Sequence, residues 1–172
     1  MRTTPLAVAA LASALLLTAC DSNGGGDDGD KNTKTNTTSA GCTVGVSVAA
    51  SAAPSAGDTG DVTVTVTNRG TSCTLNGFPG VDLVAGDASK TVPADKGAKP
   101  AKLTLAKDAT ASFTITYTRG EAGGKQSLAV KTAKFTLPGS TAAHSFAWSY
   151  GEVALKGDAP QASVTPLTQA GD

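Results

Sequence analysis

Large apolar residues alternate with small or polar residues from Cys42 onward, and this pattern limits what the chain can fold into. The alternating apolar positions are Val44/Val46/Val48, Val62/Val64/Val66, Leu103/Leu105, Phe113/Ile115/Tyr117, Phe135/Leu137 and Phe146/Trp148/Tyr150. Thr, Ser, Lys and Ala dominate the positions between them, so each segment can bury one face and leave the other in water. No stretch beyond residue 20 combines helix-forming residues with a 3.6-residue period. The pattern predicts strands.

Residues typical of turns separate these segments. Gly, Pro and Asn cluster at residues 53–57, 68–70, 76–80, 120–124 and 138–139. Many short strands joined by such turns predict an all-β fold, an antiparallel immunoglobulin-like β-sandwich over residues 42–172. The 14 Lys and Arg residues balance 14 Asp and Glu residues. This balance argues against a nucleic-acid-binding protein, which normally carries a basic excess.

The N-terminal segment has the features of a targeting signal. One positive charge in Met1–Pro5 precedes the largely apolar Leu6–Ala19 run, which is shorter than the roughly 20 residues that a membrane-spanning helix needs. Residues 1–19 are therefore expected to be a signal peptide. The run ends in Leu17-Thr-Ala-Cys20, which resembles the lipobox of bacterial lipoproteins. The resemblance implies cleavage before Cys20 and its diacylation, which would anchor the protein to the outer face of the cytoplasmic membrane. An ordinary secretory peptide and an uncleaved anchor are the alternatives.

Residues 20–41 are expected to form a disordered tether that begins with the lipidated Cys20. No large apolar side chain follows Cys20 in this segment, so burial cannot offset the entropy lost on ordering. A flexible chain of this length spans about 25 Å. Its Asp-rich half offers oxygen ligands for Ca²⁺, but Asn32 stands where an EF-hand needs a bidentate Glu. The Thr- and Ser-rich half is compatible with O-linked sugars.

Two cysteines remain once Cys20 is lipidated. Cys42 and Cys73 are then expected to form a disulfide in an oxidising compartment. No Cys-x-x-Cys spacing supports a redox-active pair. The separation is too short for the inter-sheet disulfide of true immunoglobulin domains, so only a related architecture is expected.

Several segments of residues 42–167 together resemble one known family. They are Cys42-Thr-Val-Gly-Val, the stretch from Thr67 to Leu83 with its Asn-Arg-Gly-Thr-Ser-Cys-Thr-Leu-Asn-Gly-Phe-Pro-Gly core, Leu105–Ala111, Trp148 and Val164-Thr-Pro-Leu167. They resemble the domain of unknown function 4232 family. The resemblance implies an extracytoplasmic, often lipid-anchored protein of high-GC Gram-positive bacteria. One departure is Asp108, where family members usually have Gly before a long strand.

Residues that support catalysis or metal binding are few. His144 is the only imidazole, and no Gly-x-Ser-x-Gly motif accompanies it. Glu121 and Glu152 are the only glutamates of the domain, and both fall at expected turns. Asp58 and Asp61 offer two oxygen ligands for Ca²⁺, but the segment fits a turn before a strand better. We therefore expect a protein that is not an enzyme and that has no cofactor and no metal.

Two features of the domain suggest binding surfaces. Phe146, Trp148 and Tyr150 would share one strand face, where they either stack on a sugar or fill the core. Five lysines lie between residues 90 and 107, where they either contact an anionic wall polymer or protect a sheet edge: Lys90, Lys96, Lys99, Lys102 and Lys107.

The functional expectation that follows is a lipoprotein of the cell envelope with a non-enzymatic interaction module. Its partners would be the membrane, through Cys20, and an envelope protein or wall polymer. The alternative is a protein that captures a small ligand or a carbohydrate.

Overall fold

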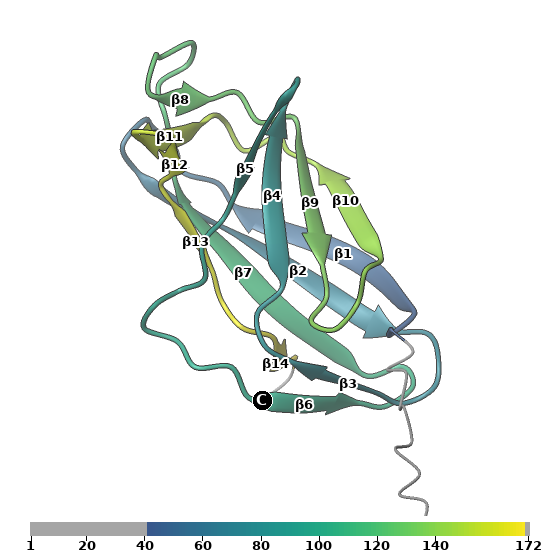
Figure 1. Ribbon diagram of the computed structural model, residues 1–172. Helices are drawn as coiled ribbons and strands as arrows, with labels where there is room; N and C mark the ends of the chain where they lie inside the picture. The colour runs from purple at the N-terminus through teal and green to yellow at the C-terminus, as the bar shows by residue number, and fades with distance from the viewer. Residues whose placement is uncertain (1–40, 171–172) are drawn as a thin grey trace, which may run out of the picture. The chain divides into compact units, whose positions relative to one another are not determined.

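The computed structural model describes residues 41–170, which form strands and no helix (Figure 1). The strands are β1 (Val44–Ser51), β2 (Thr59–Asn68), β3 (Cys73–Asn76), β4 (Gly80–Ala85), β5 (Ala88–Thr91), β6 (Lys102–Leu105), β7 (Thr110–Thr118), β8 (Ser127–Leu128), β9 (Thr132–Thr136), β10 (Ala143–Ala147), β11 (Val153–Lys156), β12 (Ala159–Pro160), β13 (Ala162–Val164) and β14 (Thr168–Gln169). Residues 41–170 hold no helix of the length and apolar character that crossing a bilayer requires.

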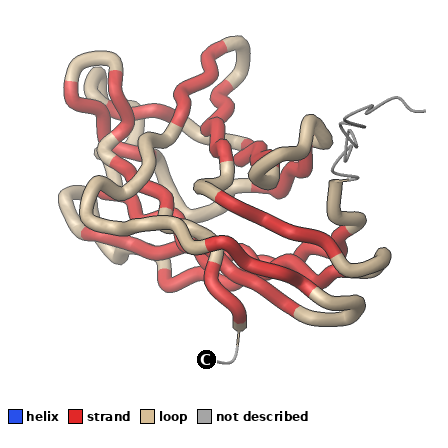
Figure 2. The backbone as a smooth tube through the Cα atoms, turned by 60° about the horizontal axis from the view of Figure 1, so that its bottom comes forward, coloured by secondary structure: helices blue, strands red, loops and turns tan. Residues whose placement is uncertain are grey.

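Two antiparallel sheets form the layers of a β-sandwich (Figures 1 and 2). One sheet has the order β1-β2-β7-β13, and β14 also pairs with β7. The other has the order β10-β9-β4-β5. Two smaller sheets, β12-β11-β8 and β3-β6, complete the domain. The expected all-β antiparallel fold with one disulfide is confirmed.

The core lies between the two large sheets and follows the alternation of the sequence. Alternate residues of β2 and β7 face inward and are buried, as are residues of β4 and β9 on the opposite sheet: Val62, Val64, Val66, Phe113, Ile115, Tyr117, Val81, Leu83, Ala133 and Phe135. The rings of Phe113 and Phe135 meet edge to face across the core, with their centroids 5.3 Å apart. Burial of each large apolar side chain stabilises the fold by about 1.5–3 kcal/mol.

Asn68 continues the inward-facing phase of β2 but carries a polar side chain into the core. It is completely buried. Its Nδ2 donates hydrogen bonds to the carbonyl oxygens of Thr71 at 2.8 Å, Leu105 at 2.9 Å and Ala106 at 3.2 Å. Its Oδ1 accepts one from the backbone N–H of Gly70 at 3.0 Å. The single side chain thereby connects the end of β2 to the end of β6.

Asp108 adopts the backbone conformation that glycine favours. Its φ is +63°, the only positive value at a non-glycine residue among those described. Its N–H donates to the carbonyl oxygen of Asn68 at 2.8 Å, and its carboxylate lies 3.6 Å from the Arg69 guanidinium. The left-handed turn before β7 is therefore made by an aspartate, which tolerates this conformation better than most residues.

Candidate interaction surface

The two cysteines of the domain form the predicted disulfide. Cys42 and Cys73 are joined, with their Cα atoms 5.6 Å apart. The bond connects the residues just before β1 to the first residue of β3. Cys20 and the signal and tether segments predicted around it lie outside the described residues, as residues 41–170 are those described.

The three aromatic residues near the end of the domain do not share a strand face. The expectation of one strand through Tyr150 is wrong, because β10 ends at Ala147. Trp148 is only 5% exposed, and its Nε1–H donates to the carbonyl oxygen of Gly151 at 2.8 Å. Its ring packs edge to face against Tyr117 and Tyr150, with centroids 5.0 Å apart in each pair. Phe146 is half-buried at the side of the core. Trp148 thus supports the fold and offers little surface to a ligand.

Two of the three candidate catalytic residues, His144 and Glu152, make structural contacts. The His144 ring stacks on Phe135 with the centroids 5.1 Å apart. Glu152 accepts a hydrogen bond from the Gly123 N–H at 2.9 Å, and Glu121 is exposed. In residues 41–170, no three His, Cys, Asp or Glu side chains gather in a group of the kind that holds a metal ion.

The two aspartates considered as Ca²⁺ ligands lie at different places. The Asp58 carboxylate accepts a hydrogen bond from the Ser55 N–H at 3.1 Å and so closes the turn before β2. Asp61 lies within β2 and accepts a hydrogen bond from the Thr116 hydroxyl at 2.7 Å. Each carboxylate is therefore engaged by its own local partner.

The lysines between residues 90 and 107 are spread over three elements. Lys90 lies on β5 and forms a 3.2 Å ion pair with Asp158. Lys102 begins β6. Lys96, Lys99 and Lys107 are exposed in the connections before and after β6.

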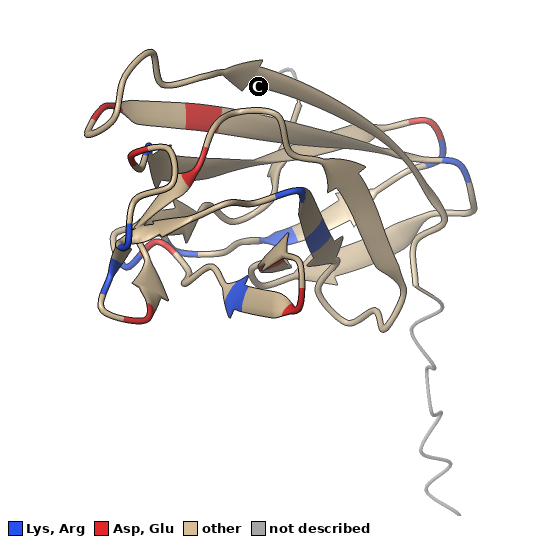
Figure 3. Cartoon of the chain, turned by 90° about the horizontal axis from the view of Figure 1, so that it is seen from above, with Lys and Arg blue, Asp and Glu red and all other residues tan. Residues whose placement is uncertain are grey.

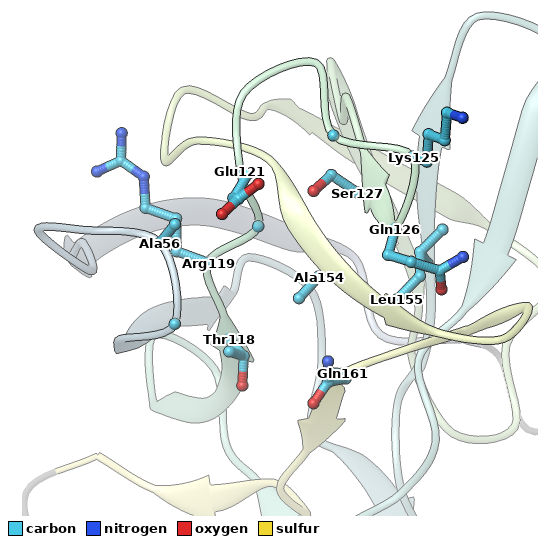
Figure 4. Close-up of a pocket in the computed structure, with 13 residues that line it drawn as sticks. Ala56, Thr118, Arg119, Glu121, Lys125, Gln126, Ser127, Ala154, Leu155 and Gln161 are labelled. Carbon is cyan, nitrogen blue, oxygen red and sulfur yellow. The ribbon is translucent and has the colours of Figure 1, made fainter.

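A hollow of about 630 Å³ lies between the turn before β2, the loop after β7 and strand β11 (Figure 4). Its lining includes Glu121, Ser127 and Gln161 and no aromatic residue. The Arg119 guanidinium donates to the carbonyl oxygens of Ala53 and Pro54 at 2.7 and 2.8 Å, and Figure 4 shows it directed away from the other labelled side chains. The hollow therefore lacks the aromatic surface expected of a sugar-binding site.

The two outer strands of the five-stranded sheet differ in how their edges are covered. Next to β13, the segment around Ala94 forms a bridge with Val164. The Val164 N–H donates to Pro93 and the Asp95 N–H donates to Val164, at 3.0 and 2.9 Å. No described segment forms such bonds along the outer edge of β1. Among residues 41–170, β1 is therefore the open edge of this sheet.

The pairing of β1 with β2 decides which backbone groups point to this open edge. The Arg69 N–H donates to the carbonyl oxygen of Thr43 at 2.7 Å, so the Thr43–Arg69 pair is hydrogen-bonded. Hydrogen-bonded and non-bonded pairs alternate along an antiparallel ladder. Four residues of β1 consequently direct their N–H and C=O groups outward: Val44, Val46, Val48 and Ala50.

Val46 also exposes an apolar side chain at this edge. It pairs with the fully buried Val66 and so lies on the inner face of its sheet. It is nevertheless 40% exposed, because β1 is the last strand of the sheet. The sequence pattern of Val44, Val46 and Val48 predicted three buried residues, and this is wrong for Val46.

Strand β10 is the edge of the opposite sheet on the same side of the sandwich (Figure 1). Its half-buried His144 and Phe146 pair with the buried Phe135 and Ala133, so they face the core. A hollow of about 600 Å³ lies between residues 41–44, at the start of β1, and residues 139–144, at the start of β10. We call β1, β10 and this hollow the open side.

The strands of the open side lack the charged residues and proline that occur at some other edges of the domain. β1 contains no Lys, Arg, Asp, Glu or Pro, and β10 contains none either. In contrast, lysine occurs in the edge strands β5 and β6, and proline occurs in the edge strand β12. Asp61 is the only charged residue in the strands of the five-stranded sheet, and Figure 3 shows long strands almost free of charge. An uncharged, exposed edge is a template for pairing with another strand.

Comparison with known proteins identifies the family. The family model described as Domain of unknown function (DUF4232) matches residues 42–168, which is most of the chain and nearly all of the described domain. No curated protein and no solved structure matches. The matched region contains the disulfide, the Asn68 hydrogen bonds and both strands of the open side. The chain therefore belongs to the DUF4232 family of domains of unknown function.

Proposed function

We propose that this protein is a lipoprotein of the cell envelope whose β-sandwich domain is a non-enzymatic interaction module. Cys20 anchors it to the outer face of the cytoplasmic membrane, and residues 21–41 connect the anchor to the domain. The Leu17-Thr-Ala-Cys20 sequence supports the anchor. The observation that carries the interaction role is the open side, above all the uncharged outer edge of β1 with its exposed Val46.

The chemistry of this edge favours a protein partner. Outward-pointing N–H and C=O groups bind a further strand through main-chain hydrogen bonds, and apolar side chains such as Val46 add contact area. A free edge of this length without charge or proline is uncommon, because it invites pairing. Such an edge fits a protein in which pairing is the function.

Photo-crosslinking in cells tests this proposal. The full chain would carry p-benzoylphenylalanine in place of Val46, and a matched chain would carry it in place of Ser89. Ser89 is an exposed residue of β5, the edge of the other sheet, next to Lys90. We expect light to join the Val46 variant to a second protein, either another copy of the chain or a different envelope protein, and to leave the Ser89 variant largely unjoined. Absence of any product at Val46, or equal yields at both positions, would contradict the proposal.

A further inference from the structure

We propose that the strand that pairs with β1 is β1 of a second copy of this chain, antiparallel to the first about a two-fold axis at Ser47. The inference rests on the proposed function and names its partner. It joins two five-stranded sheets into one continuous sheet across the two molecules.

The outward-pointing backbone groups select the register of this pairing. The groups belong to Val44, Val46, Val48 and Ala50. When the axis passes through Ser47, Val44 faces Ala50 of the second copy and Val46 faces its Val48. All four residues are then hydrogen-bonded within the bounds of β1. A shift of the axis to Val46 or Val48 leaves an outward-pointing residue at one end of each strand beyond the paired region.

The side chains agree with the same register. Residues opposite each other in an antiparallel pair lie on the same face of the sheet. The valines of the inner face therefore meet valine or alanine, and the exposed side of Val46 is covered. On the outer face, Ser47 meets Ser47 and Gly45 meets Ala49. No pair brings like charges together, because β1 has no charged residue.

The nearest charges beside β1 are complementary under this symmetry. Arg69 pairs with Thr43 at one end, and its Nε lies 3.4 Å from where a Cβ on Gly45 would be, so its side chain leans over β1. Asp61 pairs with Ser51 at the other end, on the same outer face. In the proposed register Thr43 faces Ser51 of the second copy.

One row across the joined sheet therefore runs from Arg69 and Thr43 of one molecule to Ser51 and Asp61 of the other. The two-fold axis generates a second, equivalent row at the other end of β1. Three strand spacings, about 14 Å, separate the two residues across the row, and each has a partner within its own molecule, Asp108 for Arg69 and Thr116 for Asp61. The antiparallel direction therefore places opposite charges in one row without forming an ion pair. A parallel pairing would instead place the two Arg69 side chains, which carry like charges, in the same row.

Disulfide trapping in cells tests the register directly. In the proposed pair the two Ser47 residues form a non-hydrogen-bonded pair, whose Cα atoms are about 4.5 Å apart and so within the range that a disulfide spans. Ala49 is a matched control, since it is also exposed and on the outer face of β1. It faces Gly45, so two Ala49 residues are offset by about 13 Å along the strands.

The experiment uses the full chain with two different affinity tags, expressed together under mild oxidation. We expect Ser47→Cys to give a disulfide-linked product that carries both tags, and Ala49→Cys to give about a tenfold lower yield. Adding Val46→Lys to Ser47→Cys should lower the yield about tenfold, because pairing would bury a charge at the interface. Adding Ser89→Lys to the other edge should leave the yield unchanged.

Equal yields from Ser47→Cys and Ala49→Cys, or no product from either, would overturn the self-pairing. So would a yield that Val46→Lys does not lower. If p-benzoylphenylalanine at Val46 then still joins a different envelope protein, self-pairing fails and the proposed function survives. If Val46 joins nothing, both fail.

Discussion

The side-chain Nδ2 of Asn68 donates a 2.9 Å hydrogen bond to the backbone carbonyl oxygen of Leu105, across 37 positions of the chain. This bond is one of four that the buried Asn68 side chain makes, and every one of them is to the backbone. Asn68 therefore fixes the position of the segment that leads to Cys73 against the end of β6.

Replacing Asn68 with Ala should strongly destabilise the domain. The change leaves buried backbone groups without partners, so we expect the free energy of unfolding to fall by about 2–4 kcal/mol. Urea unfolding followed by circular dichroism measures the difference. Asn76→Ala, at an exposed position of β3, is the control and should change the stability by less than about 0.5 kcal/mol. Similar losses for both variants would show that the buried hydrogen bonds of Asn68 stabilise the domain no more than the exposed side chain of Asn76 does.

Removing the disulfide should have an effect of similar size. The Cys42–Cys73 bond closes a loop with a sequence separation of 31 residues. In the chain-entropy description, its loss in the Cys42→Ser, Cys73→Ser double variant lowers the free energy of unfolding by about 3–4 kcal/mol. Thermal and urea unfolding of the double variant and the parent chain test this. A double variant as stable as the parent would contradict the expectation.

The long strands of the core could be predicted from sequence because their neighbours bury one complete face. The alternation of Val62/Val64/Val66 and of Phe113/Ile115/Tyr117 corresponds directly to inward-facing residues of β2 and β7. The same alternation does not distinguish a central strand from an edge strand. For this reason it predicts burial of Val46, which is 40% exposed in the edge strand β1. Trp148 is buried as the alternation suggests, but it lies in the segment that follows β10 and not in a strand.

The Asn68 hydrogen bonds and the open side were harder to foresee. Asn68 lies at the same phase as Val62, Val64 and Val66, and this was the signal for its burial. Its polar side chain and the turn residues after it suggested a loop instead. The openness of β1 depends on which strands pair, and this comes from contacts between residues far apart in the chain. The lack of charge in Val44–Ser51 was a visible sign of it.

Asp108 should respond to substitution according to its backbone conformation. Its φ of +63° is readily adopted by Gly and costs a β-branched residue about 1–2 kcal/mol. Asp108→Gly should therefore keep or slightly raise the melting temperature, since the exposed ion pair with Arg69 contributes little. Asp108→Val should lower the free energy of unfolding by about 1–2 kcal/mol. Arg69→Ala removes the ion pair alone and should have a small effect. A Val variant as stable as the Gly variant would refute this explanation.

Trp148 is the only tryptophan of the chain, so fluorescence reports on its surroundings without interference. Because it is buried against Tyr117 and Tyr150, we expect a blue-shifted emission maximum that moves to longer wavelength on unfolding in urea. Soluble cell-wall saccharides should leave the emission of the folded protein unchanged. A saccharide-dependent shift that saturates would indicate that the aromatic cluster binds sugar, contrary to its role in the core.

Display of the domain on the membrane through Cys20 is the central requirement of the proposed function. Mass spectrometry of the protein purified from the membrane fraction tests this most directly. We expect the N-terminal peptide to begin at Cys20 and to carry a diacylglycerol on its sulfur, and we expect the Cys20→Ser variant to be released or to stay uncleaved. An N-terminal peptide that begins elsewhere, or an unmodified Cys20 thiol in membrane-bound protein, would contradict the account.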